Sequence, residues 1–233
     1  MEDLGNTHLY QKIDSGEFEF FYDRTIDTLV KMQNTETEGL PLYDEAFLKF
    51  EMELMPEWYI EKYLGHTLNI EEKSILEKSF DVIAQEVLGQ PQDVFVHRDY
   101  HSRNIMIGGC ADEIVVIDYQ DARTGAITYD LVSLLRDVYV EFDPQMVQKM
   151  VLQFRDKKGL NVSNETFMRW FDFMGLQRHI KILGIFSRLA LRDGKDNYLD
   201  DIPLTLKYVL EIGSKYVETE PLVEFLRKVS SKN

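Results

Sequence analysis

The side chains best suited to chemistry in this chain occur in one stretch of eight residues, His97 to Asn104, which reads His-Arg-Asp-Tyr-His-Ser-Arg-Asn. A carboxylate at Asp99 can accept a hydrogen bond from a hydroxyl group and then its proton. Asn104 offers a neutral amide oxygen, and Asp118, fourteen residues further on, offers an anionic carboxylate. Oxygen ligands of this kind are preferred by Mg²⁺, which usually retains several waters. These residues predict a site that activates a hydroxyl group beside a metal ion.

The spacing of the same residues matches H-R-D-x-x-x-x-N followed by a metal-binding aspartate, as in the catalytic loop of phosphoryl-transfer enzymes. Phosphoryl transfer needs an aligned acceptor hydroxyl and cations on the phosphate oxygens, and little covalent help from the protein. A His-Arg-Asp triplet alone is a weak signal. Four fixed positions followed by Asp118 after an apolar run are much less expected by chance. The pattern predicts ATP and Mg²⁺ as cofactors.

The elements that must position these residues are mostly helical in pattern. Apolar residues at helical spacing predict helices over 18–34, 44–64 (with a new turn at Pro56), 70–88, 129–141, 144–158, 163–192, 203–217 and 220–230. Short apolar runs at 94–96, 105–107 and 114–117 predict strands, and Gly108-Gly109 between the last two predicts a β-hairpin. The hairpin would bring Asn104 and Asp118 to one cleft. The expected fold class is mainly α with a small β-hairpin.

Composition narrows the possible partners. A chain of 233 residues can bury one good core, and its formal charge of −15 disfavours nucleic acid and anionic membranes, which usually select basic patches. No stretch reaches the roughly 18 apolar residues that a membrane helix requires. The single cysteine, Cys110, cannot form an internal disulfide and suggests a reducing compartment. We expect a cytoplasmic protein with no nucleic acid and no membrane as partners.

Several segments resemble the aminoglycoside phosphotransferase and choline kinase group, and most closely its bacterial anomeric kinases of N-acetylmuramate and N-acetylglucosamine, used in cell-wall sugar recycling. The segments that carry the resemblance are 97–104, 116–122, 128–137 and 175–179, and the similarity runs from about residue 2 to residue 198.

The resemblance implies the helical C-terminal lobe of a protein-kinase-like fold. It also implies transfer of the γ-phosphate of ATP to the anomeric hydroxyl of a small-molecule sugar. By the same resemblance, Asp99 is the base, Asn104 and Asp118 are metal ligands, and Asp130 holds the catalytic loop in place. Met106 and Ile117, which flank the metal ligands, would form the floor of the adenine pocket.

Members of this group possess a β-rich N-terminal lobe that covers ATP, with a lysine on a strand. Here no strand-rich segment precedes the first predicted helix, and the thirteen glycines form neither G-x-G-x-x-G nor a P-loop. We expect residues 1–233 to be a single catalytic lobe, with the nucleotide-covering lobe either missing or encoded separately. Because that lobe supplies positioning and charge, the 233 residues alone are not expected to be strongly active.

Each of the other charged residues that stand out has two possible roles, one functional and one structural. Arg103 can touch a phosphate or the acceptor as part of the catalytic machinery, or form a salt bridge with a neighbouring carboxylate. His97 is expected to pack under the loop and support it rather than to act as an acid. Arg178 and Arg188 lie on an apolar helix, where they can bind the carboxylate of a sugar such as N-acetylmuramate or form internal ion pairs.

The sequence thus predicts an ATP- and Mg²⁺-dependent sugar kinase, or its catalytic lobe. One alternative is a kinase of another small hydroxylated metabolite, of the aminoglycoside or choline type. A second is a non-catalytic remnant that binds a sugar or a protein partner.

Overall fold

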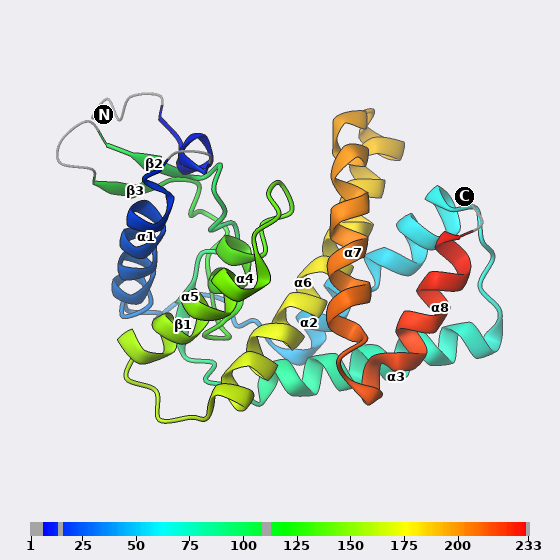
Figure 1. Cartoon of the computed structure of the whole chain (residues 1–233). Coiled ribbons are helices and arrows are strands. Elements are labelled where there is room, and N and C mark those ends of the chain that lie inside the picture. Colours follow the sequence, from blue (N-terminus) through cyan, green and yellow to red (C-terminus); the bar gives the residue numbers. More distant parts are fainter. Residues whose placement is uncertain (1–6, 14–15, 109–112, 232–233) are drawn as a thin grey trace. The chain divides into compact units, whose positions relative to one another are not determined.

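The computed structural model describes residues 7–13, 16–108 and 113–231, and over these residues the chain is mainly helical (Figure 1). The α-helices are α1 (Phe18–Met32), α2 (Glu45–Met52), α3 (Ile70–Leu88), α4 (Tyr129–Leu135), α5 (Pro144–Lys157), α6 (Asn164–Asp193), α7 (Ile202–Gly213) and α8 (Glu220–Ser230). The 3₁₀ helices are η1 (Leu9–Lys12), η3 (Asp196–Asp201) and η4 (Val217–Thr219), and η2 (Met55–Tyr63) is a π-helix. The strands are β1 (Val94–Val96), β2 (Ile105–Ile107), β3 (Ile114–Val116) and β4 (Arg123–Gly125).

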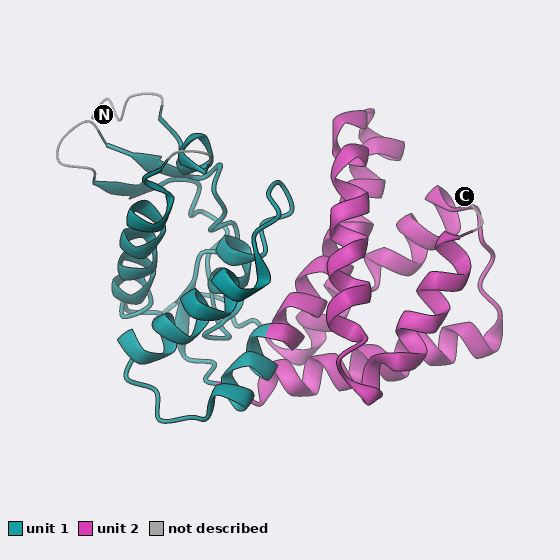
Figure 2. Cartoon of the chain, in the orientation of Figure 1, with its two compact units in different colours: residues 1–43, 91–171 teal, residues 44–90, 172–233 magenta. Residues whose placement is uncertain are grey.

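These elements form two compact units, coloured separately in Figure 2. Unit 1 comprises residues 1–43 and 91–171, and unit 2 comprises residues 44–90 and 172–233. Helix α6 begins in unit 1 and continues in unit 2. Each unit is described by itself below.

Unit 1 contains all the described strands, as two antiparallel pairs. β2 pairs with β3 as a hairpin, with Ile105 opposite Val116 and Ile107 opposite Ile114. β1 pairs with β4, a strand that crosses back from beyond the hairpin. At Gly125 on β4 an added Cβ would lie 2.8 Å from the Cβ of Tyr43, so the close approach of these segments requires glycine. The paired strands hold both ends of the loop that joins β1 to β2.

Unit 2 is helical. Its core is made of apolar side chains from α2, η2, α3, α6, α7 and α8, all less than 2% exposed: Leu48, Met52, Ile60, Phe80, Ile83, Leu183, Val209, Leu222 and Leu226. Inside it, the buried Lys181 Nζ lies 3.1 Å from Glu51 Oε1. The buried charges of Lys181 and Glu51 are therefore paired with each other, which lowers the cost of burying them.

Side-chain caps explain where several helices begin. Asn69 caps α3 by accepting the backbone N–H of Glu72 at 2.9 Å, and the Glu72 carboxylate accepts the N–H of Asn69 in return at 3.2 Å. Asp143 caps α5 by accepting the N–H groups of Gln145 and Met146, with Pro144 at the first helical position. Such caps satisfy N–H groups that have no partner within the helix.

The predicted fold class is confirmed, with corrections to individual elements. The helix predicted over 129–141 ends at Leu135, and that predicted over 203–217 ends at Gly213. The pattern over 44–64 is divided between α2 and η2, and β4 was not predicted. Gly109 and Cys110 lie outside the described residues. Within the described part of the chain, no helix has the length and apolar character needed to cross a bilayer.

Candidate active site

The loop His97–Asn104 connects β1 to β2 within unit 1. Asp130, in the first turn of α4 and fully buried, accepts the backbone N–H of His97 at 2.7 Å and that of Arg98 at 2.9 Å. The carboxylate thus satisfies two N–H groups at the point where β1 ends. Arg98 has a φ of 77°, in the left-handed region that non-glycine residues adopt only at a cost. The two hydrogen bonds to Asp130 hold the loop in this conformation, and the catalytic role of the loop stays a prediction.

Asn104 ends the loop at the start of β2. Its backbone N–H donates to the carbonyl of His101 at 2.9 Å, and its side-chain amide donates to the carbonyl of Asp99 at 3.1 Å. Because the amide nitrogen is engaged, the amide oxygen is the side-chain atom that a cation would meet. The N–H of Ile117 donates to the carbonyl of Asn104 at 3.1 Å. The loop is thereby tied to the residue that precedes Asp118.

Asp118 follows β3 by two residues and is exposed. Its φ is 72°, and the side-chain amide of Gln120 donates to Asp118 Oδ1 at 2.5 Å. The carboxylate is therefore oriented by a neighbour, with Oδ2 left to face a ligand. A carboxylate and an amide oxygen are hard donors that fit Mg²⁺. Over the residues that the structure describes, no group of three or more His, Cys, Asp or Glu could hold a metal ion. Mg²⁺ usually keeps several waters and binds through one or two carboxylates together with substrate phosphates.

His97, the first residue of the loop, is only 1% exposed. Burial lowers the pKa of the His97 ring, and the carboxylate of Asp99, the backbone of Ile117 and the carboxylate of Asp118 oppose the shift. Both carboxylates are thus within electrostatic reach of one ring. A neutral buried imidazole is suited to supporting the loop rather than to donating a proton.

The remaining predicted residues fall in both units. Met106 is buried on β2, and Ile117 is half-buried just after β3; their contact with adenine stays a prediction. The Arg103 guanidinium is exposed and stacks on a tyrosine rather than forming the alternative salt bridge with a described carboxylate. Arg178, buried, and Arg188, half-buried, belong to unit 2. The site in unit 1 is built without them, and their contact with substrate stays a prediction.

Sequence reasoning missed Asp137, Tyr139 and Gln120. Asp137 is 2% exposed, and its carboxylate accepts the backbone N–H of Ser102 at 3.0 Å and the Ser102 hydroxyl at 2.6 Å. It follows Asp130 by seven residues, about two turns of the helix predicted over 129–141, so a second carboxylate on one face of that helix was a detectable signal. In the structure α4 ends at Leu135, and Asp137 lies in the turn beyond it. Gln120 and Tyr139 had no such signal, because their contacts depend on turns.

This geometry is that of a phosphotransferase whose catalytic loop follows the protein-kinase pattern. The family model described as the phosphotransferase enzyme family matches residues 1–161. The N-acetylmuramate/N-acetylglucosamine kinase of Neisseria meningitidis serogroup B is 38% identical, over 97% of this chain and 70% of that protein. The protein of that name from Pseudomonas aeruginosa is 35% identical, over 97% of this chain and 68% of that protein. The chain belongs to the phosphotransferase enzyme family.

Solved structures agree on the fold. An ADP-bound aminoglycoside phosphotransferase, APH(2'')-Ib, aligns with a TM-score of 0.57 at 16% identity, covering 91% of this chain and 71% of that chain. An aminoglycoside-3'-phosphotransferase of type VIII aligns with a TM-score of 0.51, also at 16% identity, covering 74% of this chain and 67% of that chain. These alignments confirm the predicted protein-kinase-like helical lobe.

Proposed function

We propose that this chain is the catalytic part of an ATP- and Mg²⁺-dependent kinase that phosphorylates the anomeric hydroxyl of N-acetylmuramate or N-acetylglucosamine. The observation that carries the proposal is the loop from Asp99 to Asn104, fixed at its start by Asp130 and tied at its end to the segment of Asp118. The identity to two kinases of these sugars over 97% of the chain supports the choice of acceptor.

In this proposal Asp99 accepts a hydrogen bond from the sugar hydroxyl and aligns its oxygen with the γ-phosphorus of ATP. The oxygen forms a bond to that phosphorus, the bond from the phosphorus to the β–γ bridging oxygen breaks, and the hydroxyl proton passes to Asp99 while ADP leaves. Asn104 and Asp118 would hold Mg²⁺, which supplies positive charge for the phosphate oxygens. Asp130 acts on the reaction only through the loop.

The test is ATP-dependent phosphorylation of each sugar by the purified chain. We expect Asp99→Asn to lower kcat by about 10² to 10⁴ with an unchanged melting temperature, because an amide cannot take the proton. Asp93→Asn, which removes an exposed carboxylate just before β1, is the matched control and should keep full turnover. Turnover that survives Asp99→Asn would contradict the proposal.

The acceptor and the role of a further lobe are tested in the same assay. A kanamycin-type aminoglycoside and choline replace the sugar in parallel reactions, and phosphorylation of either one in preference to the sugars would reassign the acceptor.

In a separate reaction, the chain is extended with the predicted nucleotide-covering lobe of a related kinase. We expect turnover to rise with that lobe, because it adds positioning and charge at the phosphates. Binding of a sugar without turnover in any of these reactions would favour the non-catalytic alternative.

A further inference from the structure

Arg103 is an exposed cation on the catalytic loop, one residue before Asn104. Its guanidinium carbon lies 3.5 Å from the centre of the Tyr139 ring, a distance at which the two groups stack face to face. Over the described residues it has no hydrogen bond or ion pair with a side chain. Arg155 and Arg192, by contrast, pair with the carboxylate of the next residue. The N–H groups of Arg103 are thus held in a plane with no described acceptor.

Tyr139 is itself fixed in place by the segment after α4. The Asp137 carboxylate accepts the backbone N–H of Tyr139 at 3.0 Å through Oδ1 and both donors of Ser102 through Oδ2. The ring of His101 packs edge-on against the Tyr139 ring, with centroids 5.5 Å apart. One buried carboxylate therefore joins the turn that carries Tyr139 to the loop residue that precedes Arg103.

A guanidinium stacked on a ring keeps its N–H edges free and coplanar, which matches the two oxygens of a carboxylate or phosphate. Holding the side chain in this geometry before binding reduces the entropy lost when the anion arrives. Because a protein with a formal charge of −15 repels anions over most of its surface, an anion has to be bound by a local cation such as Arg103.

We propose that Arg103 is an oxyanion-binding residue of the catalytic loop and that Tyr139 and Asp137 are its positioning residues. The inference rests on the proposed function, since the oxyanion belongs either to an acidic sugar acceptor or to the nucleotide. A carboxylate on the acceptor sugar is the favoured source of the oxyanion. Arg103 lies on the same loop as Asp99, which would accept the hydrogen bond of the sugar hydroxyl. N-Acetylmuramate carries such a carboxylate and N-acetylglucosamine does not. A comparison of the binding of these two sugars therefore tests this source of the oxyanion.

The experiment is calorimetric titration of the chain with N-acetylmuramate, N-acetylglucosamine and MgADP. We expect Arg103→Gln to weaken binding of N-acetylmuramate by about ten- to a hundredfold, the loss that follows removal of a charge-assisted hydrogen-bonded pair. Binding of N-acetylglucosamine and of MgADP should not change. If the nucleotide is the source of the oxyanion instead, affinity for MgADP falls and that for both sugars is kept.

The positioning role is tested by a pair of substitutions at Tyr139. Tyr139→Leu keeps the apolar bulk but removes the ring, and should weaken binding of the acidic ligand by about three- to tenfold. Tyr139→Phe keeps the ring and should bind like the parent chain, an outcome that a merely structural loss at this position does not predict. Arg24→Gln is the matched control, because it removes a guanidinium that lies 5.4 Å from the centre of the Phe20 ring on α1.

Two results would overturn the inference. One is that Arg103→Gln and Arg24→Gln bind all three ligands with the same affinity; the other is that the parent chain binds none of them at millimolar concentration. These results are separate from a failure of the proposed function, which is judged by turnover that depends on Asp99. Binding of N-acetylmuramate that depends on Arg103, without turnover, would contradict the proposed function alone. Turnover together with binding that does not depend on Arg103 would contradict this inference alone.

Discussion

Asp130 accepts two consecutive backbone N–H groups, those of His97 and Arg98, from a position that solvent does not reach. Asp137, in the turn that follows α4, accepts the backbone N–H groups of Ser102 and Tyr139. Asp130 on α4 and Asp137 in the turn that follows it therefore hold the start and the end of the loop His97–Asn104. Between the paired strands β1 and β2, the loop owes its geometry to these side chains, because its backbone is not itself part of a strand ladder.

Asp130→Ala would leave two N–H groups without their acceptor. We expect the free energy of unfolding to fall by about 2–4 kcal/mol, since a buried donor left unsatisfied costs about 1–3 kcal/mol. In the active protein kcat should fall at least about tenfold, because Asp99 lies one residue beyond Arg98 and loses its alignment. Urea unfolding and the phosphorylation assay measure the two effects.

The matched control for Asp130 is Asp143, which also accepts two backbone N–H groups but at the exposed start of α5. Asp143→Ala should cost about 1 kcal/mol, as for an ordinary helix cap, with kcat unchanged. Equal costs for the two substitutions would show that burial and position in the loop do not matter.

At the scale of elements, α6 organises unit 2 through a close backbone contact. At Gly184 an added Cβ would lie 2.4 Å from the backbone carbonyl carbon of Leu54, between α2 and η2. No side chain fits at that distance, so the two segments approach each other only because this residue is glycine.

Gly184→Ala should therefore lower the free energy of unfolding by about 1–3 kcal/mol, the usual cost of overpacking. This occurs although alanine favours a helix by about 1 kcal/mol over glycine. The control is Gly89→Ala at the end of α3, where the added Cβ makes only an ordinary contact of 3.4 Å with the Glu86 carbonyl oxygen. Chemical denaturation of both variants decides the matter, and a Gly184→Ala chain as stable as the parent would disprove the close contact.

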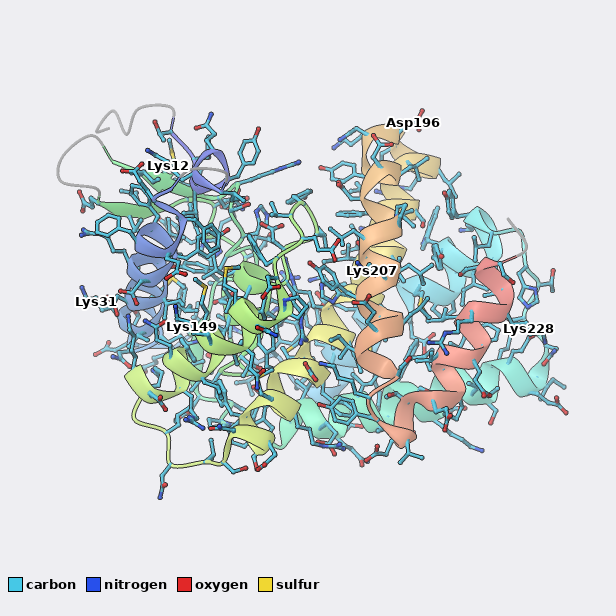
Figure 3. The ribbon with its side chains drawn as sticks, in the orientation of Figure 1. Lys12, Lys31, Lys149, Asp196, Lys207 and Lys228 are labelled. Atoms are coloured by element: carbon cyan, nitrogen blue, oxygen red, sulfur yellow. The ribbon has the colours of Figure 1, made fainter. Side chains whose placement is uncertain are left out.

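Over the whole molecule, acidic residues exceed basic ones by enough to give the formal charge of −15. Exposed cations such as Lys31 on α1 and Lys228 on α8 lie on the surfaces of the two units (Figure 3). In unit 2 the acidic residues Glu53, Glu57, Glu61 and Glu77 line a cavity of about 570 Å³, together with Lys73. Glu53 is partly exposed, and its partial desolvation, followed by the charge of Glu77, raises its pKa.

This raised pKa predicts how stability depends on pH. A carboxyl group whose pKa is higher in the folded than in the unfolded state favours folding only while it is protonated, and that contribution is lost as the pH rises through the folded value. Glu53→Gln should match the parent chain below about pH 4, where both side chains are neutral. At pH 7 it should be more stable by less than about 1 kcal/mol, because the cavity is open to solvent.

Unfolding at several pH values between 4 and 7 measures this difference. Glu224→Gln on the exposed face of α8 removes the same charge from unit 2 away from the cavity. We expect a smaller gain from it at pH 7. A difference between Glu53→Gln and the parent that stays constant with pH would rule out the raised pKa as its cause.

Periodicity and local chemistry were enough to predict most elements. The predicted bounds of the helices starting at Ile70, Pro144 and Glu220 are close to those observed, because capping residues and amphipathic spacing are local properties. The hairpin β2–β3 was also predicted from two apolar runs around a glycine pair. β4 was missed because Arg123-Thr124-Gly125 has no apolar pattern of its own and becomes a strand only by pairing with β1.

The sequence by itself determined the chemical groups of the candidate site and their order along the chain, because a fixed spacing around Asp99 and Asn104 is a covalent property. The tertiary structure decided which groups are held and by what: Asp137 on Ser102, Tyr139 beneath Arg103, and Gln120 on Asp118. These contacts depend on where α4 ends and on left-handed backbone at Arg98 and Asp118. No local pattern encodes them, because each one exists only when segments distant in sequence, or residues within a turn, are brought together by folding.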